Sequence, residues 1–254
     1  MSAREASSPI RPVLAALTLA GVAYSACAGP PFRTDDPDVR GVRELELNVF
    51  FEQTLVADGR EGVQPGIEFN YGPIENVQLT LLVPAGFTTP SGEAIVRGFG
   101  DLELGVKYRF INETDSLPAV AVSPLVAIPT GDSDKGLGNG GSQVFVPLWL
   151  SKKWGQLETY GGGGYWNNNG PNWKNYWFLG WVVQYELDEH WTLGGELFYN
   201  TGEELGQQSS TGFNLGGAVN FDEHNHILFS AGKGLRNAAV TNRVSTYVAY
   251  SLTF

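Results

Sequence analysis

Ionisable side chains in this sequence recur at every second position and alternate with apolar ones. Acids alternate with Leu, Val and Phe between residues 43 and 55, and the same spacing recurs between residues 98 and 110. A period of two places successive side chains on opposite faces of a β-strand. One face of each strand is therefore polar and the other apolar. The residues predicted to share the polar, inward face are Glu44, Glu46, Glu52, Glu68, Asp101, Glu103, Lys107, Arg109 and Arg243.

Two kinds of chemistry are open to this set of charges. If the strands enclose a lumen, an excess of carboxylates over cations would select what passes by charge. Alternatively, the acids and the cations Lys107, Arg109 and Arg243 form salt bridges that fill the interior and only stabilise it. The sequence favours a narrow lumen with a preference for cations but leaves both readings open.

Catalysis and metal binding have weaker support. His190, His224 and His226 fall in or beside turns at one predicted end of the strands, which is the wrong place for the base of a hydrolase that acts at the other end, and no inward acid neighbours a His. Asp132 and Asp134 begin a calcium-like loop, but Gly136 stands at its fifth position and the closing Glu is absent. We therefore expect no enzyme activity, no metal site and no cofactor.

The N-terminus reads as an export signal. Arg4 and Arg11 precede the apolar run from Val13 to Ala28, which is too short to span a membrane and ends in the small residues of a cleavage site. Residues 1–28 are predicted to be a cleaved signal peptide, with a lipoprotein cysteine at Cys27 as the alternative. The Pro-interrupted residues 29–41 are predicted to be a periplasmic tail, since they are unsuited to strand pairing.

Composition narrows the class of protein further. Cleavage leaves 254 − 28 = 226 residues without cysteine, so no disulfide framework supports the fold. The formal charge falls from −11 to −12 once Arg4, Glu5 and Arg11 are removed, which argues against nucleic acid as a partner. Many short alternating segments separated by Gly, Asn, Asp and Pro indicate one all-β domain over residues 42–254.

About twelve strands can be counted in this domain, and the connections between them alternate in length. The longer polar connections are predicted near residues 56–65, 87–97, 131–141, 167–175, 201–209 and 235–240. Tight turns lie between them. Long extracellular loops, short periplasmic turns and an even strand number are typical of a transmembrane antiparallel up-and-down β-barrel.

The last strand, Val244 to Phe254, alternates an apolar face with a small or polar one and ends the sequence on an aromatic residue. An edge strand of a soluble sheet would also alternate. The stretch nevertheless resembles bacterial outer-membrane β-barrels, whose terminal strand closes the barrel and is read by the assembly machinery. The resemblance implies that Tyr250, Leu252 and Phe254 carry the assembly signal.

Three further stretches narrow the resemblance. G-P-P-F-R-T-D-D-P at residues 29–37, G-F-G-D-L-E-L-G-V-K-Y-R-F at 98–110 and I-P-T-G-D at 128–132 are similar to the outer-membrane family named for the MetA pathway of phenol degradation. Membership implies a transporter or channel in the bacterial outer membrane, associated with uptake of aromatic or other hydrophobic compounds. The partners implied are outer-membrane lipid, the barrel-assembly machinery and a small solute. A structural barrel with a filled, non-conducting lumen is the alternative.

Overall fold

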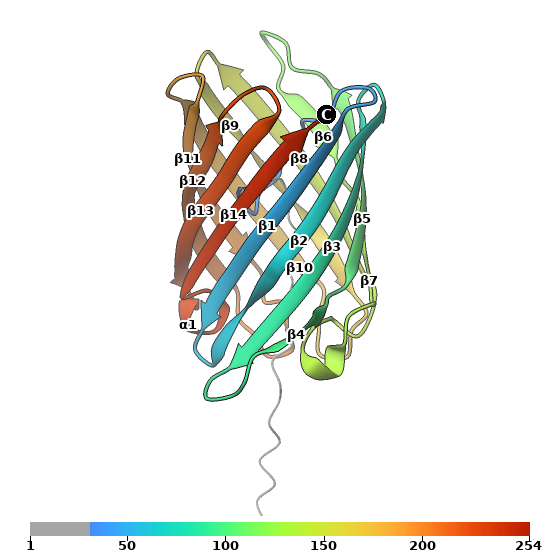
Figure 1. Cartoon of the computed structure of the whole chain (residues 1–254), viewed down its shortest axis with the longest axis vertical. Coiled ribbons are helices and arrows are strands. Elements are labelled where there is room, and N and C mark those ends of the chain that lie inside the picture. The colour runs from blue at the N-terminus through green and yellow to red at the C-terminus, as the bar shows by residue number, and fades with distance from the viewer. Residues whose placement is uncertain (1–30) are drawn as a thin grey trace, which may run out of the picture.

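The last strand of the sheet pairs with the first, so the sheet has no free edge. The computed structural model describes residues 31–254, and within them Val49 lies opposite Tyr250 and Leu47 opposite Leu252. The result is a closed antiparallel barrel (Figure 1). Closure gives every wall strand a hydrogen-bonded neighbour on both sides. The predicted signal peptide, with Cys27, lies outside the described residues.

Fourteen strand segments and two short helices make up the described chain. In order they are β1 Leu45–Val56, β2 Gly59–Ile74, β3 Val77–Pro90, β4 Val96–Phe99, β5 Leu102–Ile111, β6 Ala119–Val122, β7 Leu125–Ile128, η1 Ser133–Lys135, β8 Gln143–Trp154, β9 Leu157–Asn168, β10 Tyr176–Glu186, β11 Trp191–Asn200, β12 Ser210–Asn220, β13 Asn225–Arg236, α1 Ala238–Thr241 and β14 Val244–Thr253.

Two of the barrel strands are each built from two segments. β4 and β5 pair one after the other along β3, with a break at Gly100 and Asp101. β6 and β7 lie end to end between β5 and β8, with a break at Ser123 and Pro124, where the proline has no N–H to donate. The barrel therefore has twelve strands, as predicted.

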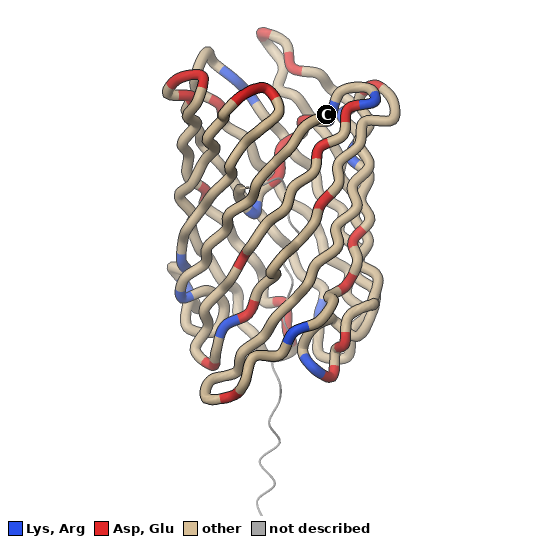
Figure 2. Tube along the Cα trace, viewed as in Figure 1, with Lys and Arg blue, Asp and Glu red and all other residues tan. Residues whose placement is uncertain are grey.

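The two faces of the wall differ in polarity as the alternation predicts. Large apolar side chains on alternate positions are exposed on the outside of nearly every strand, for example Phe69, Leu104, Trp181 and Leu215. Their neighbours point inward and are buried. Acidic positions are spaced along the strands from one end of the barrel to the other (Figure 2).

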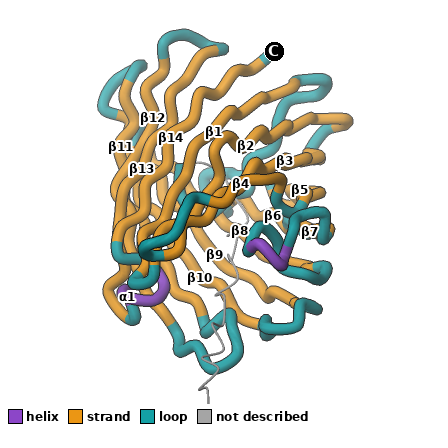
Figure 3. The backbone as a smooth tube through the Cα atoms, turned by 60° about the horizontal axis from the view of Figure 1, so that its bottom comes forward, coloured by secondary structure: helices purple, strands orange, loops and turns teal. Residues whose placement is uncertain are grey.

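Most of the longer connections gather at one end, here called the loop end, which faces down in Figure 1 and comes forward in Figure 3. They cover residues 129–142, 169–175, 201–209 and 237–243. The opposite, turn end carries Phe254 and the connections 75–76, 112–118, 155–156, 187–190 and 221–224. Among the described residues, no helix is both long and apolar enough to cross a bilayer.

Two predicted loops are largely strand. Residues 56–65 were expected to form a polar loop, but β1 and β2 meet in a two-residue turn at 57–58, and residues 87–97 contain only the short connection 91–95. Gly and Pro in β2 are accommodated by a bulge, where the register shifts between Val63 and Gly66. At Gly66 a Cβ atom would lie 2.1 Å from the Phe50 ring, so the glycine makes room for an inward aromatic side chain.

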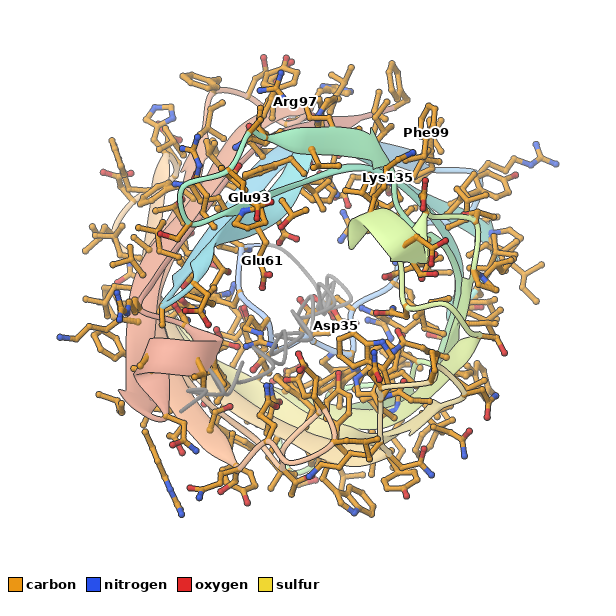
Figure 4. All side chains as sticks on the ribbon, turned by 90° about the horizontal axis from the view of Figure 1, so that it is seen from below. Asp35, Glu61, Glu93, Arg97, Phe99 and Lys135 are labelled. Atoms are coloured by element: carbon orange, nitrogen blue, oxygen red, sulfur yellow. The ribbon has the colours of Figure 1, made fainter. Side chains whose placement is uncertain are left out.

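The segment before β1 differs most from the expectation. Residues 29–41 are predicted to be a tail outside the barrel, whereas residues 31–40 run through the lumen; viewed along the barrel axis, Asp35 lies inside the ring of strands (Figure 4). Thr34 is fully buried. The inner wall is shaped for it, because a Cβ atom on Gly180 of β10 would lie 1.9 Å from Thr34 Oγ1.

The register of β5 gives a direct test of which face meets lipid. Leu104 is 47% exposed on the outside, and Glu103 is 4% exposed on the inside. Leu104→Arg should lower the free energy of unfolding by about 2 to 4 kcal/mol, the cost of a cation near the bilayer midplane. Glu103→Gln keeps the volume and removes a charge, so a much smaller effect is expected. Denaturant titrations in lipid vesicles measure both; equal losses would contradict this register.

Candidate functional site: the barrel lumen

One side of the lumen near the turn end carries a hydrogen-bonded network of carboxylates and amides. Glu68 Oε1 accepts hydrogen bonds from Asn48 Nδ2 at 3.1 Å and Asn70 Nδ2 at 2.7 Å. The same two amides also donate to Glu46 Oε1, each at 3.1 Å. Gln78 Nε2 in turn donates to Asn70 Oδ1 at 3.0 Å. Amides of β1 and β2 thus bond to both inward acids, and an amide of β3 extends the network.

The predicted inward cations Lys107 and Arg109 bond to the N-terminal segment (residues 31–40) and not to the acids of the strands. Lys107 Nζ lies 2.8 Å from Asp35 Oδ1, and Arg109 Nη1 lies 3.1 Å from Asp38 Oδ1. The segment also supplies a cation to the wall, because Arg40 Nη1 lies 2.9 Å from Glu46 Oε2. The expectation that Lys107 and Arg109 balance the strand acids is therefore replaced by pairing with a segment that enters the lumen.

Glu196 on β11 fixes the innermost part of this segment. Its Oε1 accepts hydrogen bonds from the backbone N–H and the hydroxyl of Thr34, both at 2.7 Å, and Oε2 accepts from the Arg33 N–H at 3.2 Å. Asn214 Nδ2 donates to the same carboxylate at 2.6 Å. The Ser230 hydroxyl donates to the Pro31 carbonyl at 2.6 Å. A carboxylate with four donors is a strong anchor for an otherwise irregular backbone.

Aromatic side chains line the opposite side of the lumen. Those of β8 to β11 pack into one cluster, called here the aromatic wall: Phe145, Trp149, Trp166, Tyr176, Phe178 and Phe198. Phe145 stacks on Trp166 with ring centroids 4.6 Å apart. The Arg33 guanidinium lies 4.6 Å from the centroid of Phe198 and 5.8 Å from that of Phe178, within cation–π range.

Asp101 holds a loop inside the barrel mouth. Its two carboxylate oxygens accept the backbone N–H groups of Gly131 at 2.9 Å and Asn139 at 2.8 Å. Between these two points Leu137 is 1% exposed, so the loop turns inward. The residue predicted to select charge thus bonds to the backbone of the loop. At the outer rim of this loop, the hydrogen bond from Lys135 lowers the pKa of the exposed Asp132 carboxyl.

The other predicted lumen residues lie in different environments. Glu103 is buried, and its Oε2 has no hydrogen-bond partner among the described residues. Glu52 lines a cavity near the loop end. Glu44 sits at the turn-end rim beside Arg40, with an Nη1 to Oε1 distance of 3.8 Å. Arg243 is exposed at the loop end, because it precedes β14, which begins at the outward-facing Val244 and has Ser245 as its first inward residue.

The three residues expected to carry the assembly signal face away from the lumen or lie at its rim. Tyr250 is exposed on the outer face, and its hydroxyl donates to Asn225 Oδ1. Leu252 is half-buried opposite Leu47. Phe254 is exposed, and its backbone N–H donates to the Leu45 carbonyl at 2.8 Å.

The N-terminal segment divides the lumen into two cavities. A cavity of about 150 Å³ lies toward the loop end and is lined by Pro31, Phe32 and Arg33 of the segment. A second cavity of about 260 Å³ lies toward the turn end and is lined by Asp35, Asp36 and Asp38. Thr34, anchored on Glu196, lies between the two groups.

The acids of the loop-end cavity are crowded. Burial raises the pKa of the Glu203 carboxyl above its ordinary value, and the charge of Arg33 opposes that rise. Burial also raises the pKa of the Glu204 carboxyl. Glu61 reaches into the open lumen in the axial view of Figure 4. Its carboxylate is repelled by those of Glu52, Glu203 and Glu204.

The three histidines all lie near the turn end. His190 and His224 are exposed in turns, and His226 on β13 pairs across the sheet with Ser251. No hydrogen bond joins these two side chains; instead His226 Nδ1 lies 2.8 Å from Asn220 Oδ1. Within residues 31–254, no group of three His, Cys, Asp or Glu side chains is arranged to hold a metal ion.

Sequence reasoning missed the residues that occupy and divide the lumen. Glu196 has the inward phase of β11, yet nothing in one sequence says that a segment far upstream meets it. The acidic residues of T-D-D-P-D, followed by Arg40, were a signal, since a polar segment with so many charges needs partners. The aromatic wall gave a second signal, because Trp149, Trp166, Tyr176 and Phe178 fall on the inward phase of their strands.

The contacts of Asp101 predict how the inward loop behaves when that carboxylate is changed. In Asp101→Asn only one oxygen remains to accept, so either the Gly131 or the Asn139 N–H loses its partner. The loop should then open more often, and trypsin should cleave after the exposed Lys135 faster than in the native protein. Asp134→Asn, with no hydrogen bond to the loop backbone, is the matched control. Equal cleavage rates in the two variants would contradict the role of Asp101.

Comparison with known proteins agrees with this architecture. An outer membrane channel from Pseudomonas putida F1 superposes with a TM-score of 0.69 at 17% identity, over 86% of this chain and 98% of that one. The KdgM porin gives 0.58 at 11% identity, over 82% and 99%. The NanC porin gives 0.56 at 11% identity, over 83% and 98%. At these identities the likeness concerns the fold alone. No curated protein sequence matches significantly.

The family assignment comes from the sequence match and agrees with the motifs at residues 98–110 and 128–132 and with the terminal strand; the motif at residues 29–37 lies outside the matched region. The matched region is residues 49–254, which is more than half of the chain and runs from β1 to the last residue. The chain belongs to the family described as "Putative MetA-pathway of phenol degradation".

Proposed function

We propose that this protein is a channel of the bacterial outer membrane that passes small, mainly uncharged or hydrophobic solutes, including aromatic ones. One observation carries the proposal: the lumen contains two cavities, one on each side of the N-terminal segment, and residues of that segment line both. The apolar outer face, the family and the porin-like fold support it.

The loop end would face the outside of the cell and the turn end the periplasm. Long extracellular loops and short periplasmic turns are the rule for bacterial outer-membrane barrels. In this orientation a solute meets the acidic cavity and the inward loop first. It then reaches the N-terminal segment, and finally the polar cavity beside Glu46 and Glu68.

The segment is held by contacts that can open. These contacts are ion pairs at Lys107 and Arg109 and hydrogen bonds at Glu196 and Ser230, so the segment can leave its position without any covalent bond being broken. Displacement of residues 31–36 would join the two cavities. It would also uncover Phe178 and Phe198, on which Arg33 now lies, so an aromatic solute would find a complementary surface.

The inward carboxylates would make any ion flow prefer cations. Glu52, Glu61, Glu203 and Glu204 stand near the loop end, against Arg33 in the same cavity. Anions are repelled by such an excess through ordinary charge selection.

A structural barrel with a filled lumen is the second candidate. It is favoured by the satisfied amide and carboxylate network around Glu68 and by the buried loop at Leu137. An outer-membrane hydrolase has less support, because the Ser251 hydroxyl has no hydrogen bond to His226 and therefore lacks an activating base.

A variant of Glu196, the residue that anchors the N-terminal segment, distinguishes the channel hypothesis from the filled-barrel hypothesis. Glu196→Ala removes the carboxylate that accepts the Arg33 and Thr34 N–H groups, at a cost of about 1 to 3 kcal/mol for the buried Thr34 donor. The segment should leave its position more often. Single-channel recordings of the refolded protein should then show a higher mean conductance, with a reversal potential in a salt gradient that indicates cation preference.

Glu158→Ala is the matched control for this recording. Glu158 is an inward acid of β9 that bonds to Gln184 Nε2 at 2.9 Å and makes no hydrogen bond to the segment. Its removal should leave conductance nearly unchanged. No measurable conductance in the native protein or in Glu196→Ala, together with no uptake of small solutes into vesicles, would favour the filled barrel.

The terminal strand would serve in assembly as well as closure. Phe254 is exposed at the turn end, beside the β1 and β14 seam, where the assembly machinery could reach it. Deleting Phe254 should leave unfolded protein in the periplasm. Heat-modifiable migration on gels measures the folded fraction, and removal of exposed Val42 serves as a control for a single-residue deletion. Normal yield and migration without Phe254 would refute the assembly role.

A further inference from the structure

Five basic side chains are exposed at the loop end and take no part in the contacts of the lumen. This set, called here the basic arc, consists of Arg60 on β2, Arg97 on β4, Lys233 and Arg236 on β13, and Arg243 just before β14. None of the five forms an ion pair within residues 31–254. Stretches of Lys and Arg accordingly follow the lower part of the barrel in Figure 2.

The pairing of the strands places the basic arc on the outside of the wall. Arg60 lies opposite Leu55, which is exposed on the outer face of β1. Lys233 and Leu235 are exposed on the same face of β13. Arg97 projects from the outer side of the ring of strands in the axial view of Figure 4. The basic arc therefore faces the medium around the barrel and not the solute path.

The unpaired cations are confined to one side of the loop end. β13, β14, β1, β2, β3 and β4 follow one another in the sheet. On the other side the cations have partners, because Lys135 Nζ lies 2.6 Å from Asp132 Oδ2 and Lys174 Nζ donates to a backbone carbonyl at 3.1 Å. Asp58 and Glu93, exposed in the turns beside the basic arc, do not pair with it. A chain with a formal charge of −11 thus presents one unpaired positive surface.

Apolar side chains accompany these cations. Phe99, two residues after Arg97 on β4, is 72% exposed, and Leu235, between Lys233 and Arg236, is 59% exposed. A strand needs about 9 to 11 residues to cross the hydrocarbon of a bilayer, whereas β2 has 16 residues and β13 has 12. The cations near the loop ends of these strands therefore lie at the level of the headgroups. A ligand with both a charged headgroup and acyl chains matches this arrangement.

The spacing of the strands indicates how many charges one headgroup would meet. Neighbouring strands lie about 4.8 Å apart, so Arg60 on β2 and Arg243 beside β14 are separated by roughly 10 Å across the sheet. Lys233 on β13 lies roughly 5 Å further along. Arg side chains bind phosphate through two parallel hydrogen bonds, and two phosphates on one headgroup would contact cations on both sides of β1.

We propose that the basic arc binds a lipid whose headgroup carries two phosphate groups, in the leaflet that surrounds the loop end. The phosphates lie against Arg60, Arg243 and Lys233, and the acyl chains lie along the apolar outer face of β13, β14, β1 and β2. Under the orientation proposed above, this is the outer leaflet. The site needs the barrel to lie in a membrane but does not need it to conduct.

The test measures lipid binding by native mass spectrometry on the full-length protein refolded into detergent, which carries no lipid from cells. The probes are diphosphoryl lipid A and monophosphoryl lipid A, which differ by one phosphate, and the zwitterionic dioleoylphosphatidylcholine. The diphosphoryl lipid should bind about fivefold more tightly than the monophosphoryl lipid, and the zwitterionic lipid should bind least. Excess inorganic phosphate should leave the lipid bound, because the acyl chains contribute to its affinity.

Arg60→Gln combined with Arg243→Gln should weaken binding of the diphosphoryl lipid by about tenfold to thirtyfold, since each cation near an anionic headgroup adds to the affinity. The matched control is Arg43→Gln combined with Lys153→Gln, which removes the same charge at the turn end and should bind the lipid as the native protein does. Gel migration before and after heating verifies that both double variants are folded.

Equal affinities for the two forms of lipid A, or equal losses in the two double variants, would overturn the inference. Release of the lipid by inorganic phosphate would overturn it too, since the arc would then be a site for a soluble anion. Conductance of the same preparations tests the channel separately. A barrel that binds the lipid through Arg60 and Arg243 without conducting supports the site and counts against the channel, and a conducting barrel that ignores the second phosphate does the reverse.

Discussion

Every backbone N–H and C=O group in a membrane-spanning wall must be paired within the protein, because the bilayer core offers no water to bond with. In this chain the requirement is met where β14 returns to β1 and lies along it from Leu55 to Glu46. The breaks at Asp101 and Pro124 show how much irregularity closure tolerates. At the second break, the Pro124 carbonyl still accepts the Val106 N–H at 2.9 Å, so the wall stays bonded although the ladder is interrupted.

In a closed barrel, the alternation of side chains decides which residues face lipid and which face the interior. Once the outer face is apolar, every second residue must point into a space that is narrow and poor in water, where an unpaired charge is costly. Inward charges are paired in two ways: amide side chains bond to Glu68, and the N-terminal segment bonds to Lys107 and Glu196. The N-terminal segment therefore supplies counter-charges and hydrogen-bond donors to a lumen that its strands alone would leave unsatisfied.

Fold class, strand number and the outward face could be predicted from the sequence, because a period of two is a local property that each strand displays by itself. The strand bounds near Gly66 and Pro65 could not, since a bulge lets residues that usually break strands remain in one. The path of residues 31–40 was equally hidden: its partners Lys107, Glu196 and Ser230 come from three distant strands. Arg243 was predicted to face inward because the alternation of β14 was extended to it. The strand begins one residue later, at Val244, so the alternation does not apply to Arg243.

The segment shows which contacts the lumen makes with this chain's own residues. Arg33 places a planar cation on the rings of Phe178 and Phe198, while Thr34 gives two donors to a carboxylate. Under the proposed function, a solute that carries a cation or hydrogen-bond donors would meet the same aromatic faces and carboxylates that the segment now contacts. Competition between the two follows directly, since a ligand that satisfies the aromatic wall and the acids removes part of what holds the segment. In such a design the solute itself would favour the open state, by binding it more tightly than the occluded one.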